Sequence, residues 1–99
     1  MRFSALQKYI LLSSWHTRGR LNRRKLVSFY AGKKGKPTDK MIVKVISKSI
    51  DRLISREFLV GFGEKTAHKW FIKEIKLTLK GRKIVRKLMG EQKRLPFKE

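Results

Sequence analysis

Apolar residues in the N-terminal part of the chain recur at helical spacing in two short stretches. Ser4 followed by Gln7 forms a capping-box pattern, and the apolar positions that follow predict a helix ending near Trp15. Asn22 is the next N-cap candidate, and Gly32 is a natural C-terminal stop. The sequence therefore predicts a second helix between these two residues, with Leu26, Phe29 and Tyr30 on its buried side.

The longest helical pattern covers residues 39–56. Thr38 or Asp39 supplies its N-cap, and the helix is expected to end near Arg56 or Glu57. Its apolar stripe predicts one buried face. That stripe contains Ile42, Ile46, Ile50 and Leu53, whereas the opposite face carries Lys40, Lys44, Lys48, Asp51 and Ser55.

The hydrophobic period then changes from helix to strand. Residues 58–62 are apolar and β-prone, residues 64–69 are polar, and residues 70–77 are rich in β-branched and aromatic side chains. Two such runs joined by a short polar loop predict a β-hairpin. Phe71, Ile75 and Leu77 are expected on its buried face. Trp70 and Ile72 alternate with them, and are either a self-association patch or covered by another part of the chain.

The last predicted element is a helix that follows the hairpin directly. Thr78 is its N-cap candidate, Gly81 allows close approach to the core, and Gly90 is expected to end or fray it. The complete order is three helices, a two-stranded hairpin and a C-terminal helix. This α+β order is that of a winged helix-turn-helix, in which the hairpin is the wing. We expect one domain over residues 1–90 and a tail over residues 91–99.

Composition indicates the class of partner. The 27 Lys and Arg residues outnumber the 7 Asp and Glu residues, the formal charge is +20, and no acidic residue precedes Asp39. A folded protein with this charge needs a polyanionic partner or very good solvation, and we favour the partner because surfaces that are merely soluble usually mix both signs. We prefer nucleic acid to an anionic membrane surface or an acidic protein. The longest apolar run, Tyr9 to Leu12, is too short to span a membrane.

Two segments resemble the winged-helix DNA-binding superfamily, and within it the MarR- and PadR-like regulators. Residues 47–60 resemble the end of a recognition helix that runs into the first wing strand. Leu77-Thr78-Leu79-Lys80-Gly81-Arg82 is similar to the family's Leu-Thr-x-x-Gly-Arg junction. The family usually has Gly before the first wing strand, whereas this chain has Glu57. The resemblance implies a double-stranded DNA-binding module in the cytoplasm, associated with the nucleoid, and leaves a homodimer open.

The candidate DNA-binding residues fall into three groups. On helix 39–56, which we expect in the major groove, Lys44, Ser47 and Lys48 are the base-reading candidates. Asp51 either accepts from a cytosine amino group or pairs with Lys48 or Ser55. Around the second helix, backbone-positioning contacts to phosphates are expected. All candidates are Arg18, Arg20, Arg23 and Arg24 on phosphates, Lys40, Lys44, Ser47, Lys48 and Asp51 on the long helix, and Lys65, His68 and Lys69 at the hairpin tip.

Other functional classes receive less support from the sequence. The chain contains no Cys, only two His, and neither a catalytic triad spacing nor a phosphate-cradling glycine motif, so we expect no enzyme activity, metal or cofactor. The leading interpretation is a small transcriptional regulator. The alternatives are an RNA-binding or ribosome-associated winged helix, and a non-specific chromatin-like protein.

Overall fold

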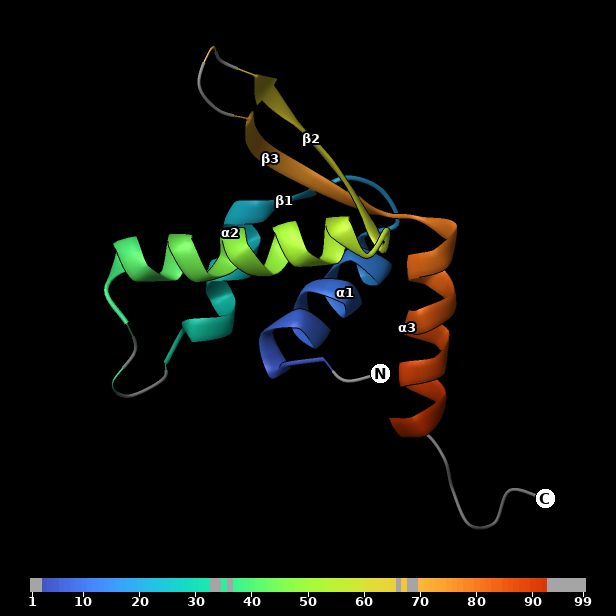
Figure 1. The fold of residues 1–99 in the computed structure, drawn as a ribbon. Coiled ribbons are helices and arrows are strands. Elements are labelled where there is room, and N and C mark those ends of the chain that lie inside the picture. Colours follow the sequence, from blue (N-terminus) through green and yellow to red (C-terminus); the bar gives the residue numbers. More distant parts are fainter. Residues whose placement is uncertain (1–2, 33–34, 36, 66, 68–69, 93–99) are drawn as a thin grey trace, which may run out of the picture.

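The computed structural model describes residues 3–32, 35, 37–65, 67 and 70–92 (Figure 1). It confirms the α+β winged-helix order, with one additional short strand. The elements in chain order are α1 (Ala5–Thr17), β1 (Leu21–Asn22), the 3₁₀ helix η1 (Arg23–Tyr30), α2 (Asp39–Ser55), β2 (Leu59–Lys65), β3 (Trp70–Leu77) and α3 (Leu79–Gln92).

Helix α1 begins at the capping box that the sequence predicts. The Ser4 hydroxyl accepts from the Gln7 backbone N–H at 3.1 Å, and the Gln7 side chain accepts from the Ser4 N–H at 3.0 Å. These two bonds satisfy backbone donors that the first helical turn leaves free. The helix ends at Arg18, whose φ of 60° lies in the left-handed region that glycine usually occupies at this position.

The second predicted helix is a 3₁₀ helix and not an α-helix. Asn22 does cap it, because its side chain accepts from the Arg24 N–H at 2.9 Å. Directly before it, Leu21 pairs with Ile75 of β3 and gives the sheet a third strand, in the order β1-β3-β2. This strand is not predicted from the sequence, because two residues are too few to show an alternating pattern.

Helix α2 agrees closely with its prediction. Thr38 is the N-cap and accepts from the Met41 N–H at 3.3 Å, and the whole predicted apolar stripe is buried. The chain then turns sharply into β2 through Glu57, which adopts a φ of 69°. This is the position at which the resembling family usually has Gly, and the left-handed backbone conformation explains that preference.

A bulge in the wing reverses part of the predicted strand pattern. Phe62 pairs with Glu74, but the next residue, Gly63, pairs with Ile72, so Lys73 is the extra residue on β3. Because a strand alternates sides at every residue, one extra residue exchanges the two faces beyond it. The expectation that Phe71 is buried is therefore wrong: it is 46% exposed, and Ile72 packs against the core instead. The side chain of Trp70 lies outside the described part.

The junction between β3 and α3 is built around Thr78. Its hydroxyl accepts from the Gly81 N–H at 2.9 Å and donates to the Glu57 carbonyl at 2.5 Å. A Cβ at Gly81 would collide with the Phe58 carbonyl oxygen, which confirms the close approach expected there. Helix α3 continues past Gly90 to Gln92, so it does not end at Gly90, and fraying there stays a prediction. Residues 93–99 of the predicted tail lie outside the described residues.

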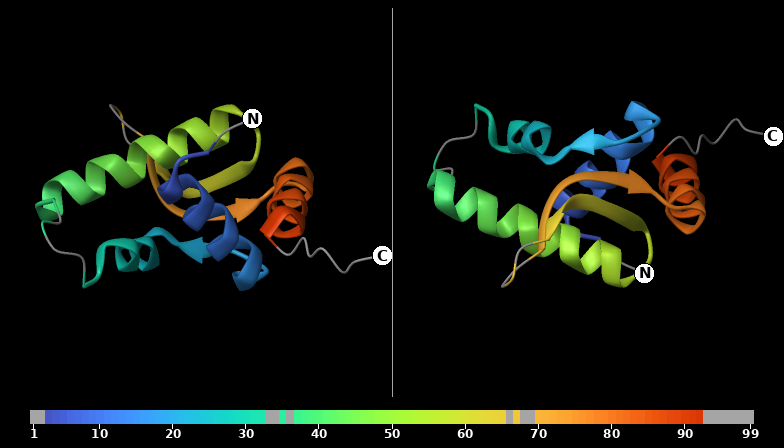
Figure 2. Two further views of the ribbon diagram at one scale, coloured as in Figure 1. Left: turned by 90° about the horizontal axis from the view of Figure 1, so that it is seen from below. Right: turned by 90° about the horizontal axis from the view of Figure 1, so that it is seen from above.

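The hydrophobic core lies around α1. This helix crosses the middle of the molecule and contacts α2, η1, β3 and α3 (Figure 2). Its Ile10 and Leu11 are fully buried, and so are Leu26 of η1, Leu53 of α2 and Ile75 of β3. Packing around a central helix leaves the outer face of α2 free and directs the wing away from the core. Within the described residues, no helix is long and apolar enough to cross a membrane.

Candidate nucleic-acid interface

The outer face of α2 carries a row of lysines. Lys40, Lys44 and Lys48 are all exposed, and their four-residue spacing places them about 6 Å apart along the helix axis. None of them takes part in an ion pair with an acidic residue of the described segments. Like charges at this spacing destabilise a helix by roughly 0.2–0.5 kcal/mol per pair, and an adjacent polyanion removes that repulsion.

Arg23 does not share this exposure, although the sequence places it among the predicted phosphate contacts. Its guanidinium donates to the Ile72 carbonyl at 3.2 Å, to the Val43 carbonyl at 3.3 Å and to the Ser47 hydroxyl at 2.5 Å. One side chain of η1 thus connects α2 to β3. Desolvation by burial lowers the pKa of Arg23, and the negative charge of Asp51 opposes that shift. The neighbouring Arg24 is exposed.

Ser47 and Asp51 lie on the side of α2 that faces Arg23. Ser47 is half-buried, and its hydroxyl oxygen accepts from the guanidinium, which leaves its O–H proton and one lone pair for other partners. Asp51 is exposed and forms no ion pair with Lys48 in the described structure. Its charge acts on Arg23 instead. With Val43, Ile50, Phe71 and Ile72, these three residues line a cleft of about 280 Å³ between α2 and β3.

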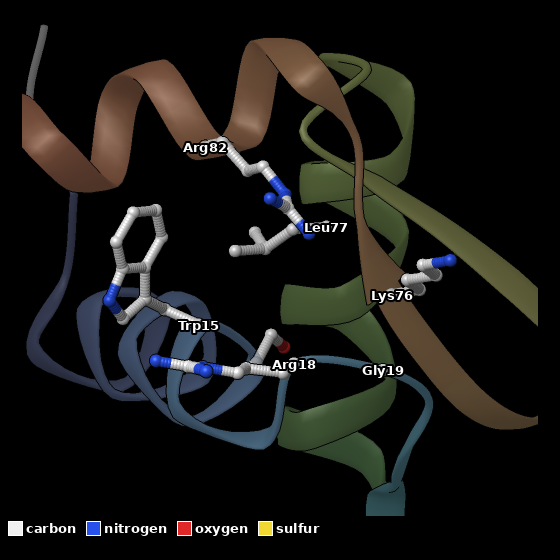
Figure 3. A pocket seen from close by; sticks show the side chains of 7 residues that line it. Trp15, Arg18, Gly19, Lys76, Leu77 and Arg82 are labelled. Carbon is white, nitrogen blue, oxygen red and sulfur yellow. The ribbon is translucent and has the colours of Figure 1, made fainter.

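Arg20 lies at the base of the wing. Its guanidinium stacks over the Phe62 ring, 3.8 Å from the centroid, and pairs with Glu74 at 3.7 Å. The stacking fixes the guanidinium plane on the sheet surface, where it remains accessible because more than half of the side chain is exposed. Arg18 lies elsewhere, at the end of α1, where it lines a cleft together with Trp15 and Arg82 (Figure 3).

The predicted wing-tip residues are not placed by the structure. Lys65 is the last residue of β2, but its side chain lies outside the described part of the chain, as do His68 and Lys69. Near the tip, Lys73 pairs with Glu64 at 3.3 Å. Among the described residues there is no group of three or more His, Asp or Glu side chains that could hold a metal ion.

Comparison with solved structures identifies the class of fold. The chain has a MarR-like winged-helix fold. A MepR-like protein complexed with pseudoligands is similar at 26% identity and a TM-score of 0.61, over 88% of this chain. The adhesin competence repressor AdcR from Streptococcus pyogenes is similar at 15% identity and a TM-score of 0.60, over 92% of this chain.

A third similar structure is a mutant MarR from E. coli in complex with operator DNA. It matches at 16% identity and a TM-score of 0.58, over 86% of this chain. The chain spans about half the length of these proteins: 53% of the MepR-like protein, 58% of AdcR and 52% of MarR. No protein-family profile matches the sequence, and no curated protein is significantly similar to it.

Proposed function

We propose that this protein is a DNA-binding transcriptional regulator that inserts α2 into the major groove of double-stranded DNA. The observation that carries the proposal is the exposed lysine row on α2, because the opposite face of the same helix is fixed in the core. The major groove is about 12 Å wide and admits one α-helix. The similar fold of MarR, solved in complex with operator DNA, supports DNA as the partner.

Within this interface, we divide the residues by role. Lys44 and Lys48 are the base readers, and Lys40 contacts phosphate. Arg20 and Arg24 are exposed cations beside the wing and η1, and they bind phosphates of the flanking backbone. Arg23 takes no part in direct contact: with Ser47 as its acceptor, it fixes α2 relative to β3. A wing-tip contact by Lys65, His68 and Lys69 remains a prediction.

Because the proposed interface contacts several phosphates, DNA binding should depend strongly on salt concentration. Each neutralised phosphate contributes a slope of about −0.9 to log K against log salt concentration. A contact set of roughly 6–10 phosphates weakens binding by about 10³–10⁵ between 50 and 200 mM salt. Because the proposed partner is duplex DNA, we expect the protein in the cytoplasm, on the nucleoid.

The decisive experiment is selection of bound sequences from a random duplex DNA pool, with an RNA pool as control. We expect an enriched duplex motif, which K44A/K48A binds with reduced sequence preference. The charge-matched variant K8A/K87A changes two exposed lysines outside the interface and retains the preference. Enrichment only from the RNA pool, or duplex binding without any motif, would replace the proposal by RNA-binding or chromatin-like function. A palindromic motif would indicate a homodimer on two half-sites.

A further inference from the structure

A second group of cations lines a cleft that the proposed interface does not use. The cleft has a volume of about 410 Å³ and lies between the end of α1, the end of β3 and the first turns of α3. Figure 3 shows Arg18 and Arg82 on opposite walls, with Leu77 between them and the Trp15 ring to one side. Lys76 also lines the cleft, but its amino group points away from the two guanidinium groups.

The charge at this cleft is not neutralised by the described part of the protein. None of the ion pairs among the described residues includes Arg18, Lys76 or Arg82. A further cation, Arg86, lies 5.9 Å from the centroid of the Trp15 ring and extends the positive surface along α3. Planar guanidinium groups on two walls match the oxygens of a phosphate group, which accept hydrogen bonds from several directions.

The backbone at Arg18 is in an unfavourable conformation for an arginine. Its φ of 60° costs an L-residue roughly 1–2 kcal/mol, and glycine would adopt it freely. Glycine is in fact the next residue, Gly19, so the chain places an arginine where the helix end favours glycine.

The cleft and the lysine row lie on different sides of the molecule. Figure 3 shows α2 behind the cleft. The apolar stripe of α2 is buried, and Lys40, Lys44 and Lys48 are exposed on the opposite face of that helix. Duplex DNA has a persistence length of about 150 base pairs, and bending a short site by 40–90° costs about 1–6 kcal/mol. A duplex that stays straight on α2 is therefore not expected to contact Arg18 and Arg82.

We propose that the cleft binds the phosphate backbone of a second DNA duplex, so that one protein molecule bridges two duplex segments. The proposal rests on the function proposed above for α2. The second contact carries no sequence information, because guanidinium groups on phosphates position a duplex without reading its bases.

The test is a bridging assay with two duplexes. One duplex carries the motif selected above and is immobilised; the other is fluorescent and of unrelated sequence. We expect the wild-type protein to retain the fluorescent duplex on the immobilised one, and R18G/R82Q to retain at least tenfold less. The salt slope for capture should fall by about two in that variant. Arg18→Gly relieves the backbone, so loss of capture without loss of thermal stability excludes misfolding as the cause.

Two controls separate the two proposals. K8Q/K87Q removes the same charge from exposed positions that do not line the cleft, and it should capture as the wild type does. R18G/R82Q should bind the immobilised motif with unchanged affinity, whereas K44A/K48A should bind it with reduced sequence preference. Failure of the wild type to bind any single duplex would overturn the proposed function; normal single-duplex binding without capture would overturn only the bridging.

Two further results would also overturn bridging through the cleft. The first is that R18G/R82Q captures the second duplex as well as the wild type does, while sedimentation shows that the protein is a dimer. Each subunit of such a dimer would bind one duplex through its own α2. The second is quenching of Trp15 fluorescence by inorganic phosphate, measured in a Trp70→Phe background, without capture of a second duplex. That result would assign the cleft to small anions.

Discussion

Replacement of Arg23 by methionine should destabilise the fold, although Arg23 belongs to an arginine pair in a highly basic segment. The substitution keeps the length of the side chain and removes hydrogen bonds to three acceptors on α2 and β3. Hydrogen bonds to charged groups contribute about 1.5–3 kcal/mol each, but water reaches this half-buried site and satisfies part of the loss. We therefore expect a total cost of about 2 kcal/mol.

Thermal unfolding followed by circular dichroism measures this loss directly. For a domain of this size, about 2 kcal/mol lowers Tm by roughly 8–16 °C. Arg24→Met is the matched control, because Arg24 is exposed and adjacent; it should leave Tm unchanged and reduce the salt slope of DNA binding by about one. An unchanged Tm for Arg23→Met, or equal effects of the two variants on stability, would refute the conclusion that the hydrogen bonds of Arg23 hold α2 and β3 together.

Two further predictions concern the backbone at the base of the wing. Gly81→Ala should destabilise the fold by about 1–3 kcal/mol, since its Cβ would collide with the Phe58 carbonyl oxygen. Urea unfolding measures this free energy, and a variant as stable as the wild type would contradict the close packing. Glu57→Gly should stabilise the fold by roughly 1 kcal/mol, because it relieves the φ of 69° and removes only an exposed pair with Lys80 at 3.9 Å. A lower Tm in this variant would show that the Glu57 side chain makes a necessary contact.

The sequence alone determined the features that depend on local chemistry. The capping box at Ser4 and Gln7, the Thr38 N-cap and the buried stripe of α2 are all present as predicted. Each depends on residues within a few positions of one another, where backbone hydrogen bonding and helical periodicity restrict the outcome. The Leu-Thr-x-x-Gly-Arg junction was also recognisable, because Gly81 and Thr78 serve the same turn.

The tertiary structure alone decided where several charged and aromatic side chains point. Arg23 and Arg24 are identical in type and adjacent, yet one bonds to α2 and β3 and the other faces solvent, a difference set by distant residues. The bulge at Lys73 exchanged the exposures of Phe71 and Ile72, although nothing in the local alternation marks it. The Arg18–Arg82 cleft joins residues far apart in the chain, and no pattern in the sequence indicated that these two arginines lie in one cleft. The direction of these side chains depends on which helices and strands pack against each other. A local sequence pattern does not specify those tertiary contacts.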